Sequence, residues 1–246
     1  MRAHLLIISA LIAAPAAHAE PPCAEQTFEG SRFTVCPVDT NRHKVEIVWA
    51  DGGGVPYRAF HIYAERNDIT AVRFAMNAGM FHADGFAVGL LKIDGQELQK
   101  LSTTNGPGNF HMKPNGVFFV TKSGVGVETT EDFAKRTDAV SATQSGPMLV
   151  INGALHPSFQ ADGPSRLIRN GVGVRGTTKA FFAISEDPVS FGKFARLFRD
   201  GLDCKDALYF DGTVSSLWIP SQSREDKSVP FGPMIIVRDR PPAKKQ

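Results

Sequence analysis

The sequence lacks the short motifs that mark the commonest hydrolases and nucleotide-binding enzymes. It contains no G-x-S-x-G nucleophile elbow, no H-E-x-x-H zinc motif, no P-loop and no C-x-x-C pair. Their absence excludes the standard serine hydrolase, zinc protease, nucleotide-binding and thiol-redox classes. Any catalysis must therefore use other polar side chains.

The chain also lacks a marked excess of one charge. Lys and Arg number 27 and Asp and Glu number 25, which gives a formal net charge of +2. A surface that binds nucleic acid normally needs clustered excess Lys and Arg. The only such cluster is in the Pro-containing C-terminal segment 238–246. We expect this segment to be a flexible, solvated tail, and we predict no nucleic-acid partner.

Only one long apolar run is present, and it lies at the N-terminus. Arg2 is followed by the apolar stretch Leu5–Pro15 and then by Ala17–Ala19, a small-x-small pattern typical of signal-peptide cleavage. The run is too short to anchor the chain in a bilayer. We predict a signal peptide over residues 1–19, cleaved after Ala19, and a secreted or periplasmic protein with no stable membrane insertion. Residues 20–246 have the length of one domain.

Cysteine is scarce, with three residues in the chain. An exported protein enters an oxidising compartment, so a disulfide is expected and one cysteine must stay unpaired. Cys23 and Cys36 flank a predicted hairpin with arms at 27–28 and 32–35, and we pair them. Cys204 precedes a predicted buried strand, and we expect a small core residue there rather than a nucleophile.

Short apolar segments that end on polar residues are abundant. Strand patterns cover Val45–Trp49, Thr70–Met76, Val88–Ile93, Val117–Val120, Ala142–Ile151, Arg166–Val174, Lys179–Ser185 and Ala207–Phe210. Helical spacing is confined to Tyr57–Arg66 and to a segment that begins at a predicted N-cap, Ser190, and ends before Gly201. No period of 20–50 residues repeats. We predict one α+β domain built from mixed, twisted β-sheets with a few helices.

Asp211 and Gly212 stand where the strand Ala207–Phe210 leaves the core. Gly212 permits backbone angles that other residues avoid, and Ser215 and Ser216 bring hydroxyl and N–H groups into the same turn. This is how folds commonly present a reactive carboxylate. The alternative is that Asp211 only caps a hairpin turn, and this segment does not decide between the two.

Other predicted strands carry polar groups and glycine at their ends in the same way. These groups are Asn77 and Gly79, Gln144 with Ser145 and Gly146, Arg169 with Asn170, and Glu186. Side chains of these types bind sugar hydroxyls and phosphate oxygens. A buried arginine needs an anion, because an unpaired guanidinium in the core is very costly. Arg169 is therefore a candidate phosphate ligand, with a structural carboxylate as its alternative partner.

The segment Asn105–Phe119 is rich in glycine, proline and asparagine and predicts a loop. Such a loop is either surface filler or a wall of backbone amides near a ligand. Lys113 and His111 are its charged or titratable residues, although a lone loop histidine is more often a surface residue than a catalyst. No histidine pair has the spacing of a metal site beyond a loose His82-x-Asp84. We predict no required cofactor, leave the metal site unassigned, and leave a structural calcium open.

Six motifs in this order resemble the phosphodiester glycosidase family. They are N-A-G-M-F at 77–81, G-N-F-x-x-K-P-N-G-V-F at 108–118, Q-S-G-P-M-L at 144–149, R-N-G-V-G at 169–173, I-S-E at 184–186 and A-L-Y-F-D-G-x-x-S-S at 207–216. The family contains the lysosomal uncovering enzyme and many bacterial secreted proteins. One departure concerns the last motif, because Thr213 and Val214 stand where relatives usually carry Gly-Gly, which bears on the shape of the turn after Asp211.

The resemblance implies a secreted hydrolase that cleaves the glycosidic C–O bond of a sugar-1-phosphodiester and releases free sugar and a phosphomonoester. It implies Asp211 and Glu186 as the catalytic carboxylates and Arg169 as a clamp on the leaving phosphate. Substrate-binding positions would be Asn77, Gly79, Lys113, Asn115, Gln144, Ser145, Gly146, Asn170, Gly212, Ser215 and Ser216. The expected partner is a sugar phosphodiester or an envelope glycan. A non-catalytic module that binds a glycan or envelope polymer, and a metal-dependent phosphodiesterase, are the alternatives.

Overall fold

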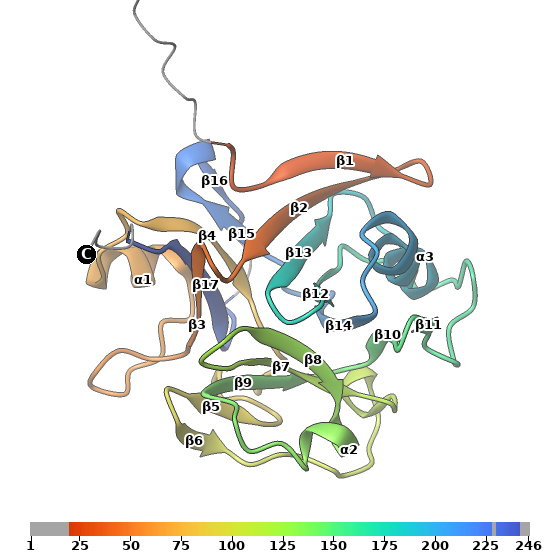
Figure 1. The fold of residues 1–246 in the computed structure, drawn as a ribbon, viewed down its shortest axis with the longest axis horizontal. Coiled ribbons are helices and arrows are strands. Elements are labelled where there is room, and N and C mark those ends of the chain that lie inside the picture. The colour runs from red at the N-terminus through yellow and green to blue at the C-terminus, as the bar shows by residue number, and fades with distance from the viewer. Residues whose placement is uncertain (1–19, 228–229, 242–246) are drawn as a thin grey trace, which may run out of the picture.

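The structure is a computed structural model that describes residues 20–227 and 230–241. Its strands form three antiparallel sheets, with short helices at the periphery (Figure 1). The fold is thus mostly β, with a small helical share that is consistent with the predicted α+β class. The prediction of mixed sheets was wrong, because every strand pairing among the described residues is antiparallel. The predicted signal peptide, residues 1–19, and the end of the predicted tail, residues 242–246, lie outside the described residues.

The strands of the described chain are β1 (Ala24–Phe28), β2 (Ser31–Asp39), β3 (His43–Val48), β4 (Val72–Asn77), β5 (Leu91–Ile93), β6 (Gln96–Gln99), β7 (Gly116–Val120), β8 (Val125–Thr129), β9 (Ser141–Ser145), β10 (Met148–Ile151), β11 (Ala154–Leu155), β12 (Asn170–Arg175), β13 (Lys179–Ser185), β14 (Asp206–Asp211), β15 (Leu217–Ile219), β16 (Arg224–Glu225) and β17 (Met234–Asp239). The helices are α1 (Phe60–Arg66), α2 (Thr130–Phe133) and α3 (Phe191–Arg196), with 3-10 turns at Asn109–His111 and Pro220–Gln222 and a π-helical turn at Leu197–Gly201.

Three sheets divide these strands. The seven-stranded sheet has the order β1-β2-β13-β12-β14-β10-β11, the β4 sheet has the order β16-β15-β4-β17-β3, and the β9 sheet has the order β6-β5-β9-β7-β8. The apolar segment Ala142–Ile151, which the sequence presents as one stretch, forms β9 and β10 in different sheets. The chain passes from one sheet to the other at Gly146 and Pro147, which are joined by a cis peptide bond.

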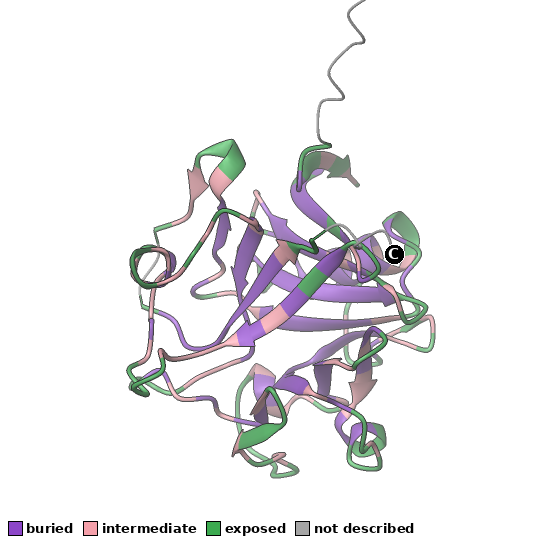
Figure 2. Ribbon diagram, turned by 60° about the vertical axis from the view of Figure 1, so that its left-hand side comes forward, coloured by how far each residue is buried: buried purple, intermediate pink, exposed green. Residues whose placement is uncertain are grey.

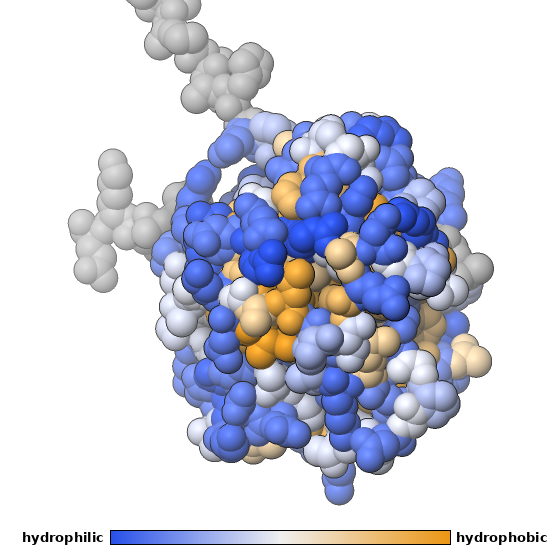
Figure 3. All heavy atoms as spheres, turned by 90° about the vertical axis from the view of Figure 1, so that its right-hand side faces the viewer, coloured by the Kyte–Doolittle hydropathy of each residue, from blue (hydrophilic) through white to orange (hydrophobic). Residues whose placement is uncertain are grey.

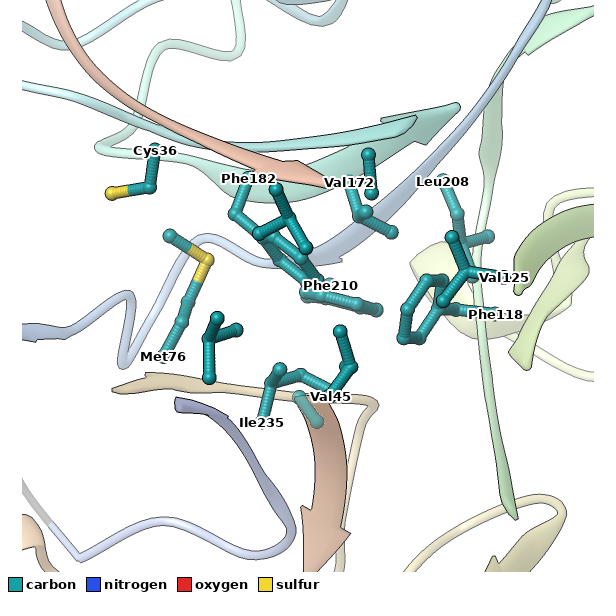
Figure 4. Packing of buried hydrophobic residues seen from close by; sticks show 14 of the residues in the cluster. Cys36, Val45, Met76, Phe118, Val125, Val172, Phe182, Leu208, Phe210 and Ile235 are labelled. Atoms are coloured by element: carbon teal, nitrogen blue, oxygen red, sulfur yellow. The ribbon is translucent and has the colours of Figure 1, made fainter. Parts of the chain in front are cut away.

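The largest hydrophobic core lies where the three sheets face one another (Figure 4). Phe182 comes from the seven-stranded sheet, Phe74 from the β4 sheet and Phe118 from the β9 sheet. The ring centroids of Phe74 and Phe118 lie 5.6 and 5.5 Å from that of Phe182, with the rings edge to face. Because one core holds all three sheets, polar groups at the strand ends around it have fixed relative positions.

Helix α3 covers the other face of the seven-stranded sheet. Ser190 accepts a hydrogen bond from the Lys193 backbone N–H at 3.1 Å, which confirms the predicted N-cap. A Cβ at Gly173 of β12 would lie 2.6 Å from the ring of Phe198, so glycine there lets the helical segment approach the sheet. The sheets are largely buried, while helices and loops carry most of the exposed residues (Figure 2). The side on which α3 lies shows a central hydrophobic area bordered by hydrophilic residues (Figure 3).

The N-terminal hairpin forms as predicted. β1 pairs with β2 from Ala24 opposite Val35 to Phe28 opposite Ser31. The structure contains the Cys23–Cys36 disulfide, which confirms the predicted pairing. Cys204 is unpaired and buried, and burial raises the pKa of its thiol to about 12, as expected for an inert core cysteine.

The C-terminal segment differs from the predicted tail. β17 continues to Asp239, Arg238 donates to Glu46 Oε2 at 2.8 Å, and the Arg240 backbone N–H donates to the Arg42 carbonyl at 2.8 Å. The prediction of a flexible, solvated tail was therefore wrong for residues 238–240, because a strand pairing that the charge pattern does not reveal orders them. Within the described residues, no helix has both the length and the apolar character needed to cross a membrane.

Candidate active site

The seven-stranded sheet places the two predicted carboxylates at the same end of its strands. Asn170, the first residue of β12, lies opposite Ile184 of β13 and opposite Asp211 of β14. Since β12 is antiparallel to both neighbours, β13 and β14 run in the same direction, and Glu186 and Asp211 come at the same end of the sheet. Strands two apart in a sheet are separated by about 10 Å. The two carboxylates therefore lie at the same end of the seven-stranded sheet, and their action in one site stays a prediction.

A buried hydrogen-bond network joins this end of the seven-stranded sheet to the β4 sheet. Asn170 Nδ2 donates to both the carbonyl and Oδ1 of Asn77, at 2.9 and 2.8 Å. The Ser216 backbone N–H donates to the same Oδ1 at 2.8 Å. Ser215 Oγ lies 3.3 Å from Asn170 Oδ1 and 3.0 Å from the Asp211 carbonyl. Residues 93 and 139 positions apart in the chain thus meet beside Asp211.

The two oxygens of Asp211 have different surroundings. Oδ1 accepts hydrogen bonds from the backbone N–H groups of Thr213 and Val214, the latter at 2.7 Å. The turn-capping alternative is therefore correct for this oxygen. Within residues 20–227 and 230–241, Oδ2 forms no hydrogen bond or ion pair, and the residue is only half-buried. One carboxylate oxygen is thus left to act on a ligand.

Val214 and Gly212, in the turn after Asp211, each make a contact that accounts for the residue type found there. Val214 is buried and packs in the same cluster as Trp218 and Phe60, a contact that glycine could not make. A Cβ at Gly212 would collide with the hydroxyl of Tyr209. Glycine is therefore required at this position by the close approach of Tyr209.

Arg169 is completely buried beside this turn. Its Nε donates to the Val189 carbonyl at 2.9 Å, and Nη1 lies 3.3 Å from the Tyr209 hydroxyl. Nη2 donates to the Ser165 carbonyl at 2.9 Å, and the guanidinium stacks 3.7 Å from the ring centre of Phe191. Burial lowers the pKa of Arg169 and raises that of Tyr209.

No carboxylate pairs with Arg169 in the described part of the chain, so the alternative of a structural carboxylate is not what the fold uses. Neutral oxygens and aromatic rings solvate the charge instead. With no exposed surface, Arg169 does not reach a ligand in this conformation, and its role as a direct phosphate clamp stays a prediction.

Glu186 belongs to an ionic chain that the sequence analysis missed. Its Oε1 accepts from Thr34 Oγ1 and from Arg224 Nη1, each at 2.6 Å. Arg224 also holds Asp226, with distances of 3.0 and 2.9 Å. These side chains remain 21 to 29% exposed. The charged segment Arg224–Asp226 is visible in the sequence, but no pattern in the neighbouring residues indicates that it pairs with Glu186.

Three predicted ligands have their polar groups occupied within the protein. Gln144 Oε1 accepts from the backbone N–H groups of Leu90 and Ser102, and its Nε2 donates to the Ser102 carbonyl. Asn115 bonds the Phe110 carbonyl and Thr130 Oγ1, each at 2.8 Å, and Lys113 Nζ donates to the Thr103 carbonyl. The structure thus places these groups in the supports of the β9 sheet rather than in the network around Asn77.

Gly79, Ser145 and Gly146 lie between these two regions. A Cβ at Gly79 would collide with the Gln144 carbonyl, and Ser145 Oγ donates to the Phe210 carbonyl at 3.1 Å. A Cβ at Gly146 would lie 2.8 Å from the Phe110 carbonyl. Their contribution is close backbone packing, which holds the β9 sheet against the end of β14.

Comparison with known proteins identifies the family. The sequence profile NAGPA, described as phosphodiester glycosidase, matches residues 70–238. The chain belongs to this family. It is 31% identical over 215 residues to the uncharacterized protein YigE of Escherichia coli (strain K12), with 87% of this chain and 84% of that protein covered.

Solved structures share the fold of this phosphodiester glycosidase domain. One is the zebrafish N-acetylglucosamine-1-phosphodiester alpha-N-acetylglucosaminidase (NAGPA) catalytic domain auto-inhibited by pro-peptide, with a TM-score of 0.60, 15% identity, and coverage of 89% of this chain and 82% of that chain. Another is a hypothetical protein from Synechocystis, with a TM-score of 0.56, 16% identity, and coverage of 89% and 61%. The chain therefore shares its fold with these two structures.

Two polar atoms near the Asn77 network lack a partner. Asn77 Nδ2 and Thr143 Oγ1 are buried and form no hydrogen bond within the described chain. Asn77 was predicted as a ligand-binding residue, whereas Thr143 gave no sequence signal because it lies inside a strand. In the same described residues, no group of three or more His, Cys, Asp or Glu side chains is arranged to hold a metal ion.

Proposed function

We propose that this protein hydrolyses the bond between the anomeric carbon and oxygen of a sugar-1-phosphodiester. Membership of the phosphodiester glycosidase family supports the general hydrolase function. The observation that carries the proposal is the Asn77–Asn170–Ser216 network beside Asp211 Oδ2, which has no partner among the described residues. The substrate class is that in the name of the zebrafish enzyme, whose fold this chain shares.

The chemistry of such a substrate suits these groups. The leaving phosphate already carries negative charge, so it needs stabilisation more than protonation. The sugar develops oxocarbenium character, which a carboxylate stabilises as nucleophile or as base for water. Asp211 Oδ2, which no described residue bonds, can take either role. Glu186, paired with Arg224, supplies a second negative group at the same end of the sheet.

We assign Arg169 an indirect role. Its guanidinium holds the Tyr209 hydroxyl, and that hydroxyl packs against Gly212. A buried positive charge at this position favours negative charge at the neighbouring turn. Asn77, Asn170 and Ser216 are as buried as Arg169, so in this conformation they hold the turn that carries Asp211, and their direct contact with a substrate stays a prediction. The partly exposed Ser215 orients sugar or phosphate oxygens, and Gln144, Asn115 and Lys113 support the loop 105–119.

Hydrolysis in ¹⁸O-labelled water tests the bond that is cleaved. Attack on the anomeric carbon places the label in the anomeric hydroxyl of the released sugar and leaves the phosphate unlabelled. A metal-activated hydroxide would attack phosphorus instead. Label in the phosphate would overturn the proposed mechanism even if the same products formed.

A glycan-binding module without catalysis is the second candidate. The observation that favours it is that Asp211 Oδ1 caps a turn and Glu186 is held by Arg224. This candidate predicts binding of a glycosyl phosphodiester with no release of reducing sugar. Release that is lost in Asp211→Asn would exclude it.

We further propose that the mature protein is secreted or periplasmic and works without a cofactor. The Cys23–Cys36 disulfide supports passage into an oxidising compartment. N-terminal sequencing of protein recovered outside the cytoplasm should begin at Glu20. Recovery of an uncleaved chain with Met1 would contradict the predicted signal peptide.

A further inference from the structure

A polar cavity lies at the end of the seven-stranded sheet and the β4 sheet that is opposite to the candidate active site. It has a volume of about 290 Å³, and its lining includes His43, Arg42, Arg73, Arg175 and Lys179. Lys179 begins β13, whereas Ser185 and Glu186 end it next to the candidate active site. A strand of seven residues spans about 20 Å, so the cavity is separate from that site.

The charge of the lining is positive. Four cationic side chains face two carboxylates, those of Glu20 and Asp39, which leaves a balance of +2. Lys179 is paired with Asp39 at 2.5 Å, and Arg73 with Asp239, just outside the lining, at 3.0 Å. The exposed guanidinium of Arg42 forms no hydrogen bond or ion pair within the described residues. The cavity therefore has positive charge that the protein does not neutralise.

His43 adds a buried hydrogen-bond donor. The residue is 5% exposed, and its Nδ1 accepts from the Asp39 backbone N–H at 3.1 Å. Nδ1 is thus the acceptor, so Nε2 carries the proton of the neutral ring. Burial, reinforced by the charge of Arg73, lowers the pKa of His43 and keeps it neutral.

Two donors at this cavity have no acceptor. His43 Nε2 forms no hydrogen bond among the described residues, and the nearest carboxylate oxygen, Asp239 Oδ1, is 3.8 Å away. Arg73 Nε is also buried and unpartnered. A buried donor without an acceptor destabilises the folded protein, because its lost hydrogen bonds to water are not replaced. A ligand that supplies acceptor oxygens would remove this destabilisation.

We infer that this cavity binds a phosphate-class oxyanion. Guanidinium groups donate paired N–H bonds to such anions, and the cavity keeps a net positive charge of +1 even when Asp239 is counted with the lining. The sequence alone does not reveal the site, because its cations come from β4, β12, β13 and the turn after β2, which are separate segments of the chain. The anion is a soluble phosphate or the phosphate of a lipid headgroup.

Binding of inorganic phosphate to the mature protein tests the inference. With ¹⁵N-labelled histidine, wild type should show the His43 Nε2–H tautomer, and millimolar phosphate should shift that resonance. Calorimetry should give a Kd that rises about tenfold or more in Arg42→Gln, which removes one charge-assisted contact. Arg42 makes only backbone hydrogen bonds, so this variant should fold. Lys135→Gln, which removes an exposed charge on the C-terminal side of α2, is the matched control and should leave the Kd unchanged.

Vesicles separate the two sources of phosphate. Co-sedimentation with phosphatidylglycerol but not with phosphatidylcholine, lost in Arg42→Gln, would assign the site to a lipid headgroup. Phosphate binding without co-sedimentation would assign it to a soluble phosphate. No shift of the His43 resonance, or an equal loss of affinity in Lys135→Gln and Arg42→Gln, would overturn the inference.

Discussion

At the residue scale, the two carboxylate oxygens of Asp211 differ in their contacts. A substitution can therefore separate the chemical role of this residue from its structural role. Asp211→Asn retains an Oδ1 that can cap the turn through Thr213 and Val214 but removes the charge. We expect turnover to fall by about 10²–10⁴-fold with a change of about 0.5 kcal/mol or less in the free energy of unfolding. Steady-state kinetics and urea titration measure the two effects.

Asp68 offers a matched control for that substitution. Its Oδ1 accepts from the Thr70 backbone N–H at 2.9 Å in a similar local turn at an exposed position. Asp68→Asn should leave turnover unchanged. Equal losses in the two variants, or full activity in Asp211→Asn, would show that the carboxylate of Asp211 takes no part in the reaction.

A substitution at Gly212 tests the close contact between Tyr209 and the turn after Asp211. Gly212→Ala places a Cβ against the Tyr209 hydroxyl, so we expect a loss of about 1–3 kcal/mol in unfolding free energy and reduced turnover. Adding Tyr209→Phe removes the colliding oxygen and should restore part of the stability. Gly52→Ala is the control, since a Cβ there meets no atom within 4 Å. Additive losses in the double variant would mean that the collision is not the cause.

At the scale of elements, the β1–β2 hairpin depends on a covalent link. β1 is at the edge of the seven-stranded sheet and pairs only with β2, and the disulfide joins cysteines 13 residues apart. Replacing Cys23 and Cys36 by alanine should lower the unfolding free energy by about 2–4 kcal/mol. Urea titration of the double variant against oxidised wild type measures this loss, and reduced wild type should show a similar loss.

Mass spectrometry of the non-reduced protein gives the control for this prediction. Cys204 should be alkylated only after unfolding, because burial keeps the pKa of its thiol near 12. A crosslink to Cys204 would contradict the arrangement of the hairpin.

At the scale of the whole molecule, two buried histidines link stability to pH. Burial is the main cause that lowers the pKa of both His43 and His156. In the unfolded chain they bind protons as the pH falls below about 6.5, while in the folded protein they stay neutral to lower pH. Stability should therefore fall as the pH drops from 6.5 toward the lower folded values.

Urea titrations across this pH range measure the slope. His43→Gln and His156→Gln should each flatten it, whereas His61→Gln should not, because the side chain of His61 is 58% exposed. A slope unchanged in both buried variants would assign the pH dependence to other groups.

The sequence by itself determined most of the local structure. Alternating or short apolar segments located β3, β4, β7, β13 and β14, and the Ser190 cap located α3. These features arise from interactions within a few residues, and a single sequence contains them in full. The same holds for the Cys23–Cys36 pair, which closes one hairpin. The six ordered motifs likewise pointed to the phosphodiester glycosidase family before any fold was known.

Only the tertiary structure decided which polar residues meet. Gln144 and Asn77 look alike at strand ends, yet Gln144 is bonded to backbone groups and to the Thr130 hydroxyl, while Asn77 joins Asn170 and Ser216. Arg169 was expected at a ligand and is instead enclosed between Phe191 and Tyr209. The reason is physical: these contacts join segments far apart in the chain, and they form only when three sheets pack on one core, whose geometry depends on all the side chains together.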